Sequence, residues 1–82
     1  MTNHQKLYDL VYLARRALAS CHYARAEELI KQLFRESVKA KNTEIIKLSS
    51  NALLECRRFH FLDVLHELNR IDPIQAKRKE LS

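Results

Sequence analysis

The chain has 82 residues, of which 46% are hydrophobic and 30% charged, and it carries a formal net charge of +5. This is typical of one small folded domain. It contains no glycine and one proline, and this composition disfavours strand hairpins and phosphate-binding loops, which need glycine for positive φ angles. No apolar run approaches the ~18 residues of a transmembrane helix. The N-terminal MTNHQKLYDL lacks the pattern of a secretory signal.

Apolar residues recur at steps of three and four, which predicts helices over about residues 4–19, 23–39, 43–56 and 59–70. Asn42 is a good N-cap for the third helix, and Glu44 suits its first turn. Asp72-Pro73 is predicted to end the fourth helix and to begin a short last one. The breaks are short, so sequential helices should be antiparallel. We expect an all-α fold of helical hairpins, with a repeat domain over 1–72 and a short charged C-terminal helix or tail over 73–82.

The similarity of ALASC at 17–21 to ALLEC at 52–56 suggests one structural unit present twice, 35 residues apart. At this shift every compared core position stays apolar or small, in the pairs Leu10–Ile45, Leu13–Leu48, Ala14–Ser49, Ala17–Ala52, Ala26–Phe61, Ile30–Leu65 and Leu33–Leu68. A helix–turn–helix unit of about 34 residues is typical of the tetratricopeptide repeat. Phe61 departs from that pattern, which has a small residue there. The alternative is an irregular four-helix bundle whose periodicities agree by chance.

A tetratricopeptide array needs roughly three repeats to bury its apolar surface, and this chain offers two repeats and a short extension. One apolar face is therefore expected to remain open. Exposed apolar surface of this kind usually marks a binding site, so we expect another protein or a second copy of the chain to cover it.

Residues suited to catalysis or metal binding are few. Cys56 and His60 are four apart, but a predicted turn separates them and two ligands make an incomplete site. Cys21 and Cys56 are expected to be free buried thiols rather than a disulfide, because the chain has no export signal. No carboxylate pair has a recognisable acid–base context. We expect no enzyme activity, no metal and no cofactor.

Short basic clusters occur at Arg15-Arg16, Arg57-Arg58 and Lys77-Arg78-Lys79. Such clusters contact phosphates in nucleic-acid-binding proteins. Acidic residues interrupt them here and no recognition helix stands out, so a solvated surface is favoured over nucleic-acid binding. A small helical transcriptional regulator, which binds a transcription factor or DNA through a basic face, remains the alternative function.

The segment NTEIIKLSSNALLECRRFHFLDVL, residues 42–65, resembles the tetratricopeptide-type chaperones of type III secretion needle subunits, and the resemblance covers about residues 20–65. The features that carry the resemblance are Cys21-His22 at a helix start, the apolar-apolar-basic-Leu-Ser-Ser run at 45–50, and the aromatic Phe59. The resemblance implies a bacterial cytoplasmic chaperone that cradles the amphipathic C-terminal helix of a needle subunit and prevents its premature polymerisation. It also implies a second partner, a small helical co-chaperone.

In that repeat geometry the first helix of each pair lines the concave groove. The residues expected to contact a partner are therefore Tyr8, Val11, Tyr12, Arg15, Leu18, Ile46, Ser50, Leu53 and Leu54. For each of them the alternative is packing inside a helical bundle. A homodimer that buries the open face against itself is a further alternative.

Overall fold

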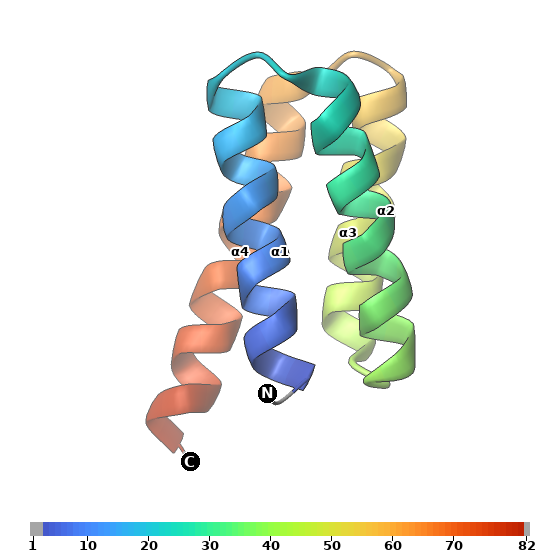
Figure 1. Cartoon of the computed structure of the whole chain (residues 1–82). Coiled ribbons are helices and arrows are strands. Elements are labelled where there is room, and N and C mark those ends of the chain that lie inside the picture. Colours follow the sequence, from blue (N-terminus) through green and yellow to red (C-terminus); the bar gives the residue numbers. More distant parts are fainter. Residues whose placement is uncertain (1–2, 82) are drawn as a thin grey trace.

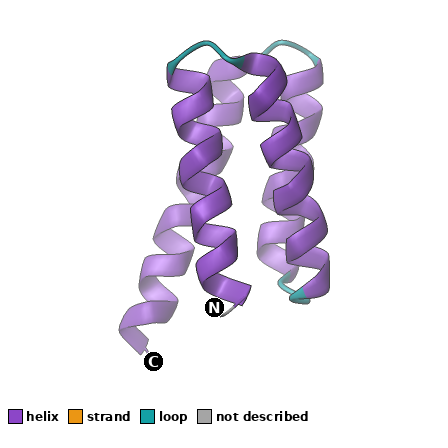
Figure 2. Cartoon of the chain, in the orientation of Figure 1, coloured by secondary structure: helices purple, strands orange, loops and turns teal. Residues whose placement is uncertain are grey.

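The computed structural model describes the backbone of residues 3–81 and the side chains of residues 5–71. The described chain folds into the helices α1 (Asn3–Ala19), α2 (Tyr23–Lys39), α3 (Thr43–Arg57) and α4 (Phe61–Leu81). Consecutive helices run in opposite directions and are joined by short turns (Figures 1 and 2). The described residues include no strand, which confirms the predicted all-α fold of helical hairpins.

The four helices form a closed ring. α1 packs on α2, α2 on α3 and α3 on α4, and α4 returns to pack on α1, whereas the diagonal pairs α1–α3 and α2–α4 make no such contact. This pairing is that of an antiparallel four-helix bundle. The expected groove required α1 and α3 to line one face together, but the bundle places them on opposite sides of its core.

The core is a single cluster to which all four helices contribute. It consists of Leu7, Leu10, Val11, Ala14, Ala17, Leu18, Ala26, Leu29, Ile30, Leu33, Ile45, Leu48, Ala52, Cys56, Val64, Leu68 and Ile71. Ser49 is also fully buried, and its hydroxyl donates a hydrogen bond of 2.6 Å to the carbonyl of Ile45. The polar atom is therefore satisfied within its own helix.

The turns at 20–22, 40–42 and 58–60 share one backbone conformation. In each, the middle residue has a positive φ: 59° at Cys21, 55° at Lys41 and 62° at Phe59. The next N–H then bonds to the carbonyl five residues back, in the pairs His22–Ala17, Asn42–Ser37 and His60–Glu55. This is the Schellman motif, which usually takes glycine at the positive-φ position. Because the chain has no glycine, each turn carries a left-handed strain of about 1–2 kcal/mol.

The predicted cap of α3 is confirmed. Asn42 is buried, and its side-chain oxygen accepts a hydrogen bond of 3.2 Å from the N–H of Ile45. Glu44 lies in the first turn of the helix, where a carboxylate interacts favourably with the helix dipole. The sequence therefore marked the start of α3 correctly.

The turns establish an internal register that differs from the predicted one. Cys21 and Phe59 occupy the same turn position 38 residues apart. At this shift buried residues match one another, in the pairs Leu7–Ile45, Leu10–Leu48, Val11–Ser49, Ala14–Ala52, Ala26–Val64, Ile30–Leu68 and Leu33–Ile71. The predicted shift of 35 is wrong, because it pairs Leu13, which is 42% exposed, with the buried Leu48. ALASC and ALLEC are therefore not equivalent segments.

The predicted helix end at Asp72-Pro73 is also wrong. α4 continues from Phe61 to Leu81, so the predicted division into 1–72 and 73–82 falls inside one helix. Proline has no N–H to donate to the carbonyl four residues earlier, which removes one intrahelical bond. The helix continues across this position despite that loss.

Candidate functional site

Two of the three turns lie at the same end of the bundle. The turns at 20–22 and 58–60 are at the top of Figures 1 and 2, and the turn at 40–42 is at the opposite end. This arrangement follows from the alternating helix directions. We refer to residues 20–23 and 58–63 together as the two-loop end.

An aromatic cluster covers the core at the two-loop end. The rings of Tyr23 and Phe61 stack with centroids 3.8 Å apart and planes 9° from parallel. Phe59 meets Phe61 edge to face, at 6.1 Å and 72°. Tyr23 begins α2 and Phe61 begins α4, which are diagonal in the bundle. The stack therefore joins two helices that do not otherwise pack together.

The two-loop end exposes large apolar side chains to solvent. Phe59 is 78% exposed and Leu62 is 84% exposed. Both line an open hollow that continues over His60, Phe61 and Asp63. An aromatic residue at positive φ is sterically unfavourable, and strain of this kind is often retained at functional positions.

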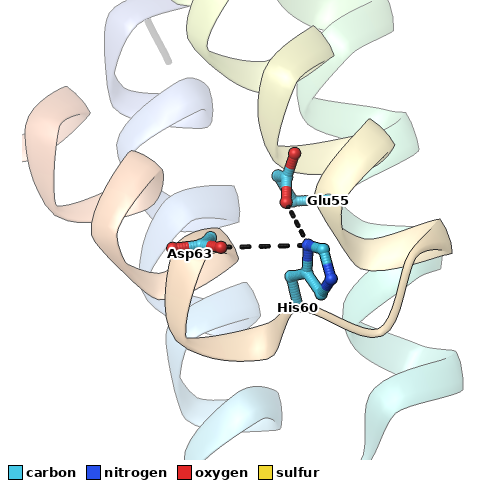
Figure 3. Close-up of side chains that lie close together, drawn as sticks. All are labelled: Glu55, His60 and Asp63. Atoms are coloured by element: carbon cyan, nitrogen blue, oxygen red, sulfur yellow. Dashed lines mark hydrogen bonds and ion pairs between the residues drawn. The ribbon is translucent and has the colours of Figure 1, made fainter.

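Beside this apolar surface, three ionisable side chains converge (Figure 3). His60 Nδ1 lies 2.7 Å from Glu55 Oε2 and 3.9 Å from Asp63 Oδ2. Arg58 Nη1 lies 3.9 Å from the other oxygen of Glu55. Glu55 belongs to the last turns of α3, His60 precedes α4 and Asp63 lies in its first turn. The cluster therefore spans the α3–α4 turn, with His60 and Asp63 exposed.

Both cysteines are free thiols, as predicted, but only Cys56 is buried. Cys21 is exposed, and its hydrogen bond with Tyr23 is the main cause that raises the pKa of that phenol. Burial raises the pKa of Cys56, and the nearby carboxylate of Glu27 adds to the effect. Cys56 is therefore held in its thiol form as a core side chain.

Exposed lysines form ion pairs at the opposite end of the bundle. Lys6 of α1 and Lys39 of α2 lie 3.4 and 3.5 Å from Glu36 Oε1. Partial burial by itself would raise the pKa of Glu36, but the two lysines outweigh it and lower that pKa. These contacts connect α1 to α2 and offer no reactive group.

The nine residues predicted to contact a partner do not form one surface. Val11 and Leu18 lie in the core, because α1 turns that face inward to pack in the closed ring; for these two, packing inside the bundle is the correct interpretation. Leu53 is partly buried against the core. The other six are half-buried (Tyr8, Arg15, Ile46) or exposed (Tyr12, Ser50, Leu54).

Sequence reasoning missed the residues that the two-loop end brings together. The sequence distinguishes Phe59 only as an aromatic that carries the family resemblance, and it gives no reason to select Leu62. Glu55 and His60 are five residues apart, and His60 and Asp63 are three apart. Because a turn separates Glu55 from His60, the three residues do not lie on one helix, and the spacing that brings side chains together on a helix does not predict their contact. The closest available signal was the sequence FHFL at 59–62, a concentration of apolar side chains at the start of the predicted fourth helix.

Comparisons with known proteins give no relationship: no family model, no curated protein and no solved structure matches the chain. Among the described residues, no helix combines the length and the apolar character needed to cross a membrane.

Proposed function

We propose that this chain is a protein-binding chaperone that holds an amphipathic helix of its partner at the two-loop end. The observation that carries the proposal is the exposure of Phe59 and Leu62 in one hollow. Large apolar side chains grouped on a surface are characteristic of binding sites. Helix-in-groove recognition uses such anchors for the apolar face of a helix.

The charges of the chain bear on which charged residues should flank the apolar face of the partner helix. Arg57 and Arg58 lie directly before Phe59, and Arg57 makes no ion pair with the described residues. The chain as a whole carries a net charge of +5. Within this end Arg57 and Arg58 are balanced by Glu55 and Asp63, so it is the net charge of the whole chain that would steer a helix with an acidic margin toward this surface.

The specific partner in this proposal is a type III secretion needle subunit, in the bacterial cytoplasm, with a small helical co-chaperone in the same complex. The support is the resemblance of residues 42–65 to chaperones of these subunits. Covering the amphipathic helix of the subunit would remove the surface through which it polymerises. The two-loop end replaces the α1–α3 groove as the contact surface, because the closed ring takes part of that groove into its core.

The test is co-expression with a needle subunit, followed by size-exclusion chromatography and light scattering. The unaltered chain should keep the subunit in a soluble complex. The double variant Phe59→Ser/Leu62→Ser should release it to polymerise. Val38→Ser is the matched control, because Val38 is also a large exposed apolar residue, 48% exposed near the far end of α2. A double variant that holds the subunit as well as the control does would refute the proposed surface.

A second measurement tests which kind of helix binds, without reference to a particular partner protein. Fluorescence anisotropy compares two labelled amphipathic helical peptides with the same apolar face, one with acidic and one with basic flanking residues. The acidic peptide should bind more tightly, and added salt should weaken it. Equal binding of both peptides would contradict the charge argument. Self-association at micromolar concentration, lost in the double variant, would instead identify a second copy of the chain as the occupant.

A further inference from the structure

The Glu55–His60–Asp63 cluster has a composition and spacing suited to a cation. One imidazole nitrogen and one oxygen from each carboxylate all lie within 4.8 Å of one another. In Figure 3 both carboxylates lie on the side of the ring that carries Nδ1. We propose that these three residues bind one divalent transition-metal ion, Zn²⁺ in preference to Ca²⁺ or Mg²⁺.

Two of the three ligand separations, those from His60 Nδ1, are close to those of a zinc site. With Zn–N and Zn–O bonds of about 2.0–2.1 Å, neighbouring ligand atoms of a tetrahedral site lie about 3.3 Å apart. The observed separations from His60 Nδ1 are 2.7 Å to Glu55 Oε2 and 3.9 Å to Asp63 Oδ2. Each differs from the tetrahedral value by about 0.6 Å, which a small side-chain rotation supplies. The ion takes the place of the hydrogen bond between His60 and Glu55.

The backbone already holds the three ligands near each other. The N–H of His60 donates to the carbonyl of Glu55 at 2.9 Å, and the N–H of Val64 donates to the carbonyl of His60 at 3.0 Å. The first bond closes the turn and the second begins α4. Arg58 Nη1 lies 3.9 Å from the second oxygen of Glu55, which is the distance of a loose ion pair and not of a hydrogen bond.

The α1–α2 turn can be compared with the α3–α4 turn, which carries the cluster. His22 occupies the position in the α1–α2 turn that His60 occupies in the α3–α4 turn, with the same backbone hydrogen bond. The residues five before and three after His22 are Ala17 and Arg25, instead of Glu55 and Asp63. The turn therefore forms without carboxylates at these positions, and the pair beside His60 is not a requirement of the backbone.

The ligand types select the metal. A neutral imidazole with carboxylates suits Zn²⁺ and related transition ions, whereas Ca²⁺ and Mg²⁺ prefer ligands that are all oxygen. Three protein ligands leave the fourth position to water, on the exposed side of the cluster. A bound ion would join the end of α3 to the start of α4 and stabilise the folded chain.

Calorimetric titration with ZnCl₂ tests the site, in the full chain with Cys21→Ser so that the exposed thiol does not compete. One ion per chain should bind, with a rise in melting temperature. His60→Ala and the isosteric Asp63→Asn should each weaken binding at least tenfold, whereas the matched control His22→Ala should not. The near-isosteric Asp63→Asn keeps the test valid if His60→Ala perturbs the turn, and far-UV circular dichroism checks each fold.

Co²⁺ gives an independent readout. The bound ion should show visible absorption typical of low-coordinate Co²⁺ without a thiolate charge-transfer band, and Asp63→Asn should remove it. The proposal is overturned if Zn²⁺ does not bind, if binding survives Asp63→Asn unchanged, or if His22→Ala abolishes it. A thiolate band would also overturn it, because the ion would then be held by cysteine.

Discussion

Tyr23 and Phe61 stack face to face across a diagonal of the bundle, with ring centroids 3.8 Å apart. They are the first residues of α2 and α4, so the contact ties together the two turns of the two-loop end. The stack also places Phe59 and Leu62 on a supported surface, because Leu62 follows Phe61 in the chain and the Phe59 ring meets the Phe61 ring edge to face. The exposed apolar side chains therefore lie over an ordered aromatic base.

A double-mutant cycle should detect this stack. Tyr23→Ala and Phe61→Ala should each lower the free energy of unfolding by about 1–2 kcal/mol, because both rings are partly exposed. Their coupling energy should be about 0.5–1.5 kcal/mol. Urea denaturation of the single and double variants gives both quantities. Tyr12→Ala with Phe61→Ala is the control cycle, since Tyr12 is exposed on α1; a coupling equal to that of the control would contradict a stabilising stack.

Lys41→Gly should stabilise the protein. Lys41 has a φ of 55° and its side chain is exposed, so glycine removes the left-handed strain at the cost of little packing. The expected gain is about 1 kcal/mol. Gln32→Gly, at an exposed position inside α2, should instead lose about 0.5–1 kcal/mol. Chemical denaturation measures both, and a change of the same sign in the two variants would show that Lys41 is unstrained.

Phe59→Gly should separate stability from binding. Relief of strain at φ 62° offsets the lost edge-to-face contact with Phe61, so the free energy of unfolding should change by less than about 1 kcal/mol. Affinity for the partner helix should fall about tenfold or more if Phe59 is an anchor. Phe59→Leu, which keeps an apolar side chain, should bind more tightly than Phe59→Gly. Equal affinity of the two variants would exclude Phe59 from the contact.

The two thiols should differ in reactivity and in their effect on stability. Iodoacetamide should modify Cys21 in the folded protein and Cys56 only after unfolding, as mass spectrometry can establish. Because the pKa of Cys56 is raised in the folded state, its contribution to stability is complete below the ordinary thiol pKa of about 8.5 and is lost as pH rises beyond it. Cys56→Ala should reduce this alkaline loss relative to Cys21→Ala. Identical alkaline profiles for both variants would contradict the assignment.

The positions of the helices were largely predictable, because apolar residues spaced by three and four mark helical segments. The exact buried face was not, since Val11 and Leu18 lie in the core and Leu13 is exposed. The turns at 20–22 and 40–42 fall where the sequence predicted them. The end of α4 was not predictable from Pro73, because a helix can continue past proline at the cost of one hydrogen bond. The side chains around that position lie outside the described residues.

The internal register was missed for a geometric reason. Shifts of 35 and 38 differ by three residues, which is close to one helical turn of 3.6, so an amphipathic pattern looks similar at both. Only the turns distinguish them, and their positive-φ positions carry Cys21, Lys41 and Phe59 instead of glycine. The absence of glycine also made the Glu55–His60–Asp63 cluster hard to predict. Glu55 and Asp63 come close to His60 only because of the turn at 58–60, and no glycine marks the position of that turn.

Of the four helix–helix contacts in the ring, only the contact between α1 and α4 joins helices that no turn connects. The contacts of α1 with α2, α2 with α3, and α3 with α4 each adjoin a tight turn, whereas α1 and α4 meet only through the folded structure and share the least extensive contact of the four. Contacts between segments distant in sequence form late in folding because their loop-closure entropy is largest. Native-state amide exchange should therefore find the first cooperative opening between α1 and α4, with the two hairpins still intact.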